Sequence, residues 1–161
     1  MSEKKLKLKL YADGACSGNP GPGAYAAIMV CGSTEKIFNR AFVLTTNNRM
    51  ELLGVIEPME DFDFPCEIEV WTDSQYIVNA INKKWLESWV KKGWKKADNK
   101  PVLNIDLWER MLKVLNRHTI KFNWIKGHSK HPQNERCDQM AVNNILVGDK
   151  MHDEIYEESR R

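Results

Sequence analysis

The fold is decided at residues 6–13, which read LKLKLYAD. Apolar side chains occupy positions 6, 8, 10 and 12, the period of two of a β-strand with one buried face. Asp13 is expected to end this strand on its polar side. Residues 66–73, CEIEVWTD, alternate in the same way and place Asp73 at the end of a second strand. The sequence thus predicts two strands that each end in an aspartate.

The rest of the chain alternates further strands with helices. The expected elements are strands at residues 6–13, 24–30, 36–43, 66–73 and 119–126, and helices from 45 onward and at 75–82, 83–96, 103–115 and 135–147. Pro58 removes a backbone donor, so the first helix should end or kink there. The order βββαβαααβα predicts an α/β fold with a mixed five-stranded sheet flanked by helices. The tail at 148–161 carries five acids and is a candidate mobile segment.

Length and composition bound the protein class. The chain has 161 residues, 42% hydrophobic and 29% charged, which suits one domain spanning residues 1–161 and excludes a disordered chain. No run approaches about 18 apolar residues, and the N-terminus lacks the apolar core of a secretion signal. The four cysteines form no Cys-x-x-Cys pair, which favours free thiols. We therefore expect a cytoplasmic protein without membrane contact.

Charge is polarised along the chain although its net value is only +2. Residues 83–96, KKWLESWVKKGWKK, hold six lysines, one acid and three of the six tryptophans; we call them the Lys/Trp segment. Residues 57–69 carry six acids and no base, which predicts a solvated edge that repels anions. The Lys/Trp segment is the candidate surface for a polyanion.

Four acids are expected at the ends of elements: Asp13 and Asp73 after strands, and Glu51 and Asp138 in early turns of helices. Such acids usually cap helices or face solvent. If the sheet edge brings them together, their repulsion is relieved by hard divalent cations such as Mg²⁺, and two ions about 3.5–4 Å apart form the usual clamp for phosphodiester displacement. Spacing alone does not choose between these interpretations.

Local sequence motifs favour the metal-site interpretation of the four acids. They are YADGACSGNPGPG at 11–23, TTNNRMEL at 45–52, TDSQY at 72–76, and WIKGH with NERCD between residues 124 and 138. Together they resemble the signatures of type 1 ribonuclease H in its bacterial form, in register over most of the chain. Residues 85–108 look like the basic protrusion of that family.

The resemblance implies an endonuclease that uses two metal ions to cut the RNA strand of an RNA/DNA hybrid, leaving 5′-phosphate and 3′-hydroxyl ends. Mg²⁺ is the expected ion and Mn²⁺ a substitute. Asp13 would bridge both ions, Asp138 would hold the ion that activates water, and Glu51 with Asp73 would hold the ion at the leaving oxygen. His128 matches the histidine that assists proton transfer or product release, although a single loop histidine is more often without a role.

The resemblance also implies residues that contact the hybrid. Asn19, Asn48 and Gln75 match positions facing the minor groove, with Asn47 nearby, and Thr46 matches a contact to a DNA-strand phosphate. Amides can both donate to and accept from a 2′-hydroxyl, which distinguishes RNA from DNA, and the same residues also cap helices and turns.

The Lys/Trp segment adds further candidate contacts. Trp85 and Trp89 are four residues apart and so should share a helix face. Lysines would release counter-ions on binding phosphates, while aromatic rings pack on sugar or base, although tryptophans at helical spacing are more often core. The candidates are Lys84, Trp85, Trp89, Lys91, Lys92, Trp94, Lys95 and Lys96.

Other functions were weighed against a monomeric nuclease acting on RNA/DNA hybrids. His128, His131 and Cys137 lack the paired spacing of a structural zinc site. A binding module for hybrid or double-stranded RNA would gain nothing from four clustered acids. A related nuclease or integrase with a DNA substrate fits the amide set less well.

Overall fold

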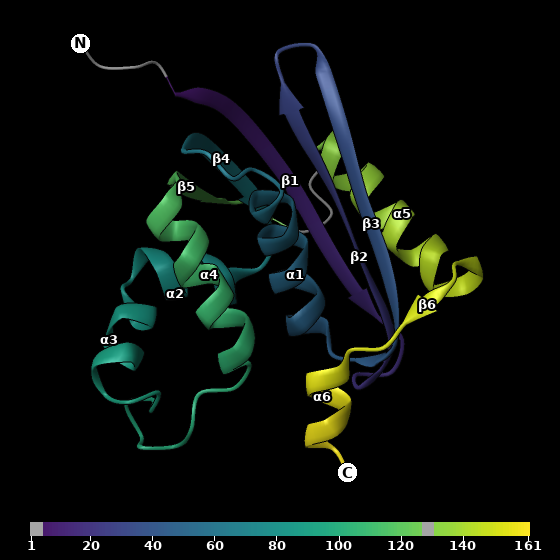
Figure 1. Ribbon diagram of the computed structural model, residues 1–161. Helices are drawn as coiled ribbons and strands as arrows, with labels where there is room; N and C mark the ends of the chain where they lie inside the picture. Colours follow the sequence, from purple (N-terminus) through teal and green to yellow (C-terminus); the bar gives the residue numbers. More distant parts are fainter. Residues whose placement is uncertain (1–4, 127–130) are drawn as a thin grey trace.

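The structure is a computed structural model that describes residues 5–126 and 131–161, and it shows one mixed sheet with helices on both faces (Figure 1). The strands are β1 (Leu6–Cys16), β2 (Gly21–Cys31), β3 (Thr34–Thr45), β4 (Cys66–Thr72), β5 (Thr119–Trp124) and β6 (Lys150–Met151), in the order β5-β4-β1-β2-β3-β6. The first three strands pair antiparallel, whereas β4 pairs parallel with β1 and β5, and β6 pairs parallel with β3. The predicted α/β fold with a mixed sheet is confirmed, but the described residues form six strands rather than five.

The helices divide between the two faces of this sheet. They are α1 (Asn47–Glu60), α2 (Gln75–Asn82), α3 (Trp85–Lys91), α4 (Ile105–Arg117), α5 (Pro132–Val147) and α6 (Glu154–Ser159). Alternation along β1 turns Leu8, Leu10 and Ala12 toward the large core shared with α1 and α4, and Tyr11 toward a smaller core under α5. Within the described residues, no helix is long and apolar enough to cross a membrane.

The predicted end of the first strand was wrong. Strand β1 does not end at Asp13 but continues to Cys16, because residues 14–16 still pair with β2. Its pairing with β4 does end earlier, at Tyr11 and Trp71. Pro58 lies inside α1, which ends two residues later at Glu60; the proline removes one backbone hydrogen bond but does not end the helix at once.

The tail that was expected to be a candidate mobile segment forms β6 and α6. Asp153, between these two elements, is buried and accepts hydrogen bonds from the Arg49 side chain at 2.7 and 3.0 Å and from the Thr45 hydroxyl at 2.7 Å. A buried ion pair therefore ties the C-terminal segment to the start of α1.

The acidic stretch at 57–69 is not simply a solvated edge. Glu57 accepts a 2.6 Å hydrogen bond from the Tyr25 hydroxyl, Glu60 accepts two from Arg110, and Asp61 pairs with Lys36. The bases come from other elements, so a count of charges within the stretch could not reveal them.

Candidate metal centre and nucleic-acid interface

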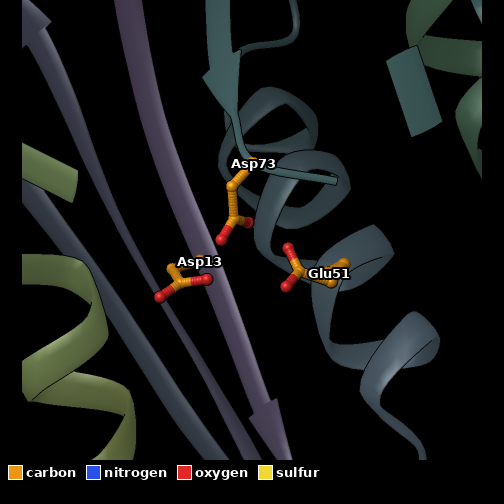
Figure 2. Close-up of side chains that lie close together, drawn as sticks. All are labelled: Asp13, Glu51 and Asp73. Atoms are coloured by element: carbon orange, nitrogen blue, oxygen red, sulfur yellow. The ribbon is translucent and has the colours of Figure 1, made fainter. Parts of the chain in front are cut away.

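Three carboxylates meet beside the end of β4. One oxygen each of Asp13, Glu51 and Asp73 lies within 4.8 Å of the others, and Figure 2 shows the side chains pointing toward one another from β1, α1 and the residue that follows β4. Asp13 and Glu51 are buried, with 8% and 6% of their surface exposed. The sequence correctly predicted that these three acids converge.

The backbone explains this convergence. The last β1–β4 pair is Tyr11 with Trp71, so Asp13 and Asp73 each lie two residues beyond it. Thr46 caps α1 by accepting from the Arg49 amide, and Glu51 follows as the fifth helical residue, one turn later than a first-turn acid. At Gly14 a Cβ atom would lie 2.5 Å from the backbone nitrogen of Glu51, so only glycine lets α1 approach β1 this closely.

The cluster resists ionisation. Burial and the charges of Asp73 and Asp138 raise the pKa of Asp13 to about 8, against a smaller opposing effect of the Gly14 amide, which donates to Asp13 at 3.0 Å. Burial, with Asp13 and Asp73 nearby, raises the pKa of Glu51 well above its usual range. Glu51 Oε2 is buried without a hydrogen-bond partner among the described residues.

These features fit a divalent cation. The donors are hard carboxylate oxygens, which Mg²⁺ and related ions prefer, and a cation would offset the repulsion and satisfy Glu51 Oε2. In the part of the chain that is described, no group of three or more potential ligands includes a cysteine or histidine. The zinc alternative therefore gains no support.

Asp138, on α5, interacts with Asp13 but is not among the three acids whose oxygens lie within 4.8 Å of one another. It is exposed, yet a side-chain hydrogen bond and its charge act on Asp13. It lies in the second turn rather than the first, because α5 begins at Pro132. Proline is common at the first position of a helix, a signal that the sequence contained and the prediction did not use. His128 lies outside the described residues.

The predicted amide residues gather near the N-terminus of α1. The side-chain oxygen of Asn19 accepts the Asn47 amide at 3.0 Å, and Thr46 is the N-cap residue. Asn19, Thr46 and Asn48 line a cavity of about 730 Å³. Gln75 stands apart from this group, exposed at the first position of α2 and two residues after Asp73.

Several residues of this cavity were missed by the sequence analysis. Asn104, Asp106, Tyr156 and Arg160 also line it. Asp106 accepts two hydrogen bonds from the buried Arg49, at 2.9 and 2.7 Å. These residues lie more than 50 positions from the amide group, and no local pattern connects them with it.

The Lys/Trp segment forms α3 and the turn that follows. Trp85 is 38% exposed, but Trp89 is buried and packs on Trp108 with ring centroids 5.5 Å apart. The two tryptophans therefore do not share an exposed face, and Trp89 is a core residue. Trp94 is half-buried against the same core.

The lysines of the segment lie on its surface. Lys84, Lys91, Lys92 and Lys95 are exposed, and Lys96 is half-buried. Lys91 pairs with Glu87 at 3.3 Å, an exposed i,i+4 pair. Such pairs contribute little, so the charge of Lys91 remains available to a polyanion.

Comparisons with known proteins agree with the motifs. The model of the RNase H family matches residues 5–145. Ribonuclease H of Nitratidesulfovibrio vulgaris (strain DP4) is 54% identical over 137 residues, covering 85% of this chain and 88% of that protein. Ribonuclease H of Serratia proteamaculans (strain 568) is 50% identical over 135 residues, covering 84% and 86%.

Two solved structures share the fold. LC9-RNase H1, described as a type 1 RNase H with the type 2 active-site motif, has a TM-score of 0.80 and 26% identity, over 100% of this chain and 84% of that one. LC11-RNase H1, solved in complex with RNA/DNA hybrid, has a TM-score of 0.64 and 21% identity, over 86% of this chain and 96% of that one.

An α/β fold with a carboxylate cluster beside the end of a strand defines a class of metal-dependent enzymes. Within that class, the chain belongs to the RNase H family, in its type 1 form.

Proposed function

We propose that this enzyme hydrolyses the RNA strand of RNA/DNA hybrids, with two Mg²⁺ ions held by Asp13, Glu51, Asp73 and Asp138. The observation that carries the proposal is the group of three carboxylates whose oxygens lie within 4.8 Å of one another and two of whose pKa values are raised. A polyanionic substrate would not be drawn to such a site without cations. Mn²⁺ has a similar preference for oxygen ligands and would replace Mg²⁺.

The four acids would have different roles in holding the metal ions. Bound ions supply an activated water and stabilise the leaving 3′-oxygen. Asp13, at the centre, contacts acids on both sides and would bridge the ions. Asp138 would hold the ion that activates the water, and Glu51 with Asp73 would hold the ion at the leaving oxygen. Water attacks phosphorus as the bond to the 3′-oxygen breaks, which leaves a 5′-phosphate and a 3′-hydroxyl; His128 would assist the proton transfer.

Hybrid recognition would use the surface on both sides of this centre. Asn19 and Asn48 line the cavity at the start of α1, Gln75 is exposed two residues after Asp73, and their amides would contact 2′-hydroxyl groups. The cavity beside Thr46 would take a phosphate of the DNA strand. LC11-RNase H1, which shares the fold, was solved with RNA/DNA hybrid.

The Lys/Trp segment would extend the contact to more distant phosphates. Its exposed lysines supply the positive charge, and Trp85, which is 38% exposed, supplies the most exposed ring of the segment. Trp89 and Trp94 would support this surface from the core side.

Four free cysteines suit a reducing compartment. Together with the bacterial relatives, they suit the proposed cytoplasmic location, and the proposed oligomeric state is a monomer. Sedimentation at the enzyme concentration used in the assay tests the oligomeric state, and the proposal predicts the mass of a monomer.

The decisive experiment compares end-labelled RNA/DNA, RNA/RNA and DNA/DNA duplexes with Mg²⁺, with Mn²⁺ and in excess EDTA. Only the RNA strand of the hybrid should be cut, only with metal, to 5′-phosphate ends. Asp73→Asn should abolish most turnover, whereas Asp63→Asn, an exposed acid outside the site, should not. Cutting in EDTA would exclude metal catalysis, and binding of hybrid without cleavage would indicate a binding module.

A further inference from the structure

An aromatic group lies next to the carboxylate cluster and has no role in the proposed chemistry. The ring of His131 packs on Tyr11, with centroids 5.1 Å apart, and on Trp71, with centroids 6.3 Å apart and planes 20° from parallel. Tyr11 and Trp71 are paired neighbours in β1 and β4. They lie two residues before Asp13 and Asp73, and because Asp13 is still within β1, alternation places its side chain on the same face of the sheet as that of Tyr11.

His131 is also the N-cap residue of α5, and its side chain makes no capping hydrogen bond. Its role at the start of the helix is therefore contact with the sheet rather than satisfaction of backbone amides. Asp138 follows seven residues later, two helical turns on and on nearly the same side of α5. The position of this one ring thus bears directly on where the Asp138 carboxylate lies.

The buried contacts between the middle of α5 and the sheet are made largely by small side chains. Cys137 and Ala141 are the buried residues of α5, and they pack on a surface that includes Ala24, Ala26 and Ala41. Small side chains give little resistance to a shift of the helix along the sheet. Two polar contacts tie α5 to β3: Arg136 pairs with Glu35 at 3.0 Å, and Asn144 donates to Asn39 at 2.9 Å. On the β1 and β4 side, the Cys137 thiol makes a weak contact with the Tyr11 carbonyl at 3.5 Å, and the large ring of His131 packs against the strands that lead to Asp13 and Asp73.

We infer that His131 is a positioning residue: by packing on Tyr11 and Trp71 it holds α5 where Asp138 can share metal ions with Asp13. The inference rests on the proposed function, because it assigns the aromatic group a purpose through the proposed metal ligands. It concerns the shape of the imidazole ring and not its protons. In agreement, His131 Nδ1 is buried without a hydrogen-bond partner among the described residues, a poor arrangement for a proton carrier.

The test is metal binding in the absence of substrate, measured by isothermal titration calorimetry with Mn²⁺ and Mg²⁺. His131→Ala should weaken binding about tenfold, the size found when groups that orient metal ligands are removed. His131→Phe keeps an aromatic ring and should restore most of the affinity. His152→Ala, which changes an exposed histidine outside the site, is the matched control.

Turnover should follow the same pattern. The metal concentration for half-maximal activity should rise in His131→Ala, while KM for hybrid at saturating metal changes little, and a thermal melt shows whether each variant is folded. Wild-type metal affinity in His131→Ala would overturn the inference, and so would a His131→Phe variant as weak as His131→Ala. A wild-type protein that binds no divalent ion would instead refute the proposed function.

Discussion

Replacing Asp13 by asparagine should inactivate the enzyme and at the same time stabilise the metal-free protein. In the folded chain the pKa of Asp13 is raised from 3.8 to about 8, chiefly by burial and then by Asp73. At pH 7 the folded protein therefore keeps this carboxyl protonated, whereas the unfolded chain ionises it. That difference opposes folding by up to about 4 kcal/mol, at 1.36 kcal/mol for each pH unit above the ordinary pKa.

Asparagine avoids the penalty and its side-chain oxygen can still accept from the Gly14 amide. Burying the amide costs roughly 1–3 kcal/mol, so the net gain should be about 1–3 kcal/mol. For a domain of this size, that gain corresponds to a rise in Tm of about 2–10 °C.

The pH dependence gives the sharper measurement. Below the ordinary pKa of an aspartate, the Asp13 carboxyl is protonated in both the folded and the unfolded chain and does not oppose folding. As pH rises toward the pKa of the folded chain, only the unfolded chain ionises, and the stability of the wild type falls. The stability of Asp13→Asn relative to wild type should thus be lowest at pH 4, where only the cost of burying the amide remains, and should grow up to about pH 8, in urea or thermal unfolding with EDTA. Saturating Mg²⁺ should shrink it, because metal binding stabilises only the wild type. Asp63→Asn is the control, and a variant no more stable than wild type at pH 8 would refute the reasoning.

Three further outcomes follow from other parts of the structure. Changing the last four lysines of the Lys/Trp segment to alanine should raise KM for the hybrid and flatten the salt dependence of KM with little change in kcat, as a salt titration with hybrid will show. Trp85→Ala should raise KM without altering the slope of log KM against log salt concentration. Burial lowers the pKa of His118, so with Mg²⁺ present the Tm should fall as pH drops below about 6.5, and His118→Gln should lose part of that dependence. Asp153→Asn should cost about 1–3 kcal/mol of unfolding free energy in urea, less than the loss of a sole buried partner, because Arg49 keeps Asp106.

The central sheet and the acid cluster were predictable because their signals are local. Strict alternation at residues 6–13 and 66–73 reports which face of a strand is buried, and the helix at Asn47 is announced by the capping side chain of Thr46. The resemblance of the local motifs to type 1 ribonuclease H then assigned Asp13, Glu51 and Asp73 to one site, and the structure brings their carboxylates together.

What could not be predicted depends on partners far apart in sequence. Strand β6 has two residues and no periodicity, and the segment is held by Asp153, which bonds a side chain 104 positions away. Their spacing of four residues gave Trp85 and Trp89 the same predicted helix face. In the structure only Trp89 packs on the rings of Tyr76 in α2 and Trp108 in α4. The surface or core character of a tryptophan is decided by such neighbours.

Helix α1 buries one basic and one acidic side chain, and their surroundings differ. Arg49 is 3% exposed and receives two carboxylates, Asp106 and Asp153, with hydrogen bonds of 2.7–3.0 Å. Glu51, two residues later, is as deeply buried, yet its neighbours in the cluster are further acids, and Oε2 has no hydrogen-bond partner in the described part of the chain. Because a buried charge without compensation is costly, a fold that neutralises one so completely and leaves the other among like charges is built to receive a countercharge from outside. The contrast within one helix is thus an argument for a cation site that does not depend on the motifs.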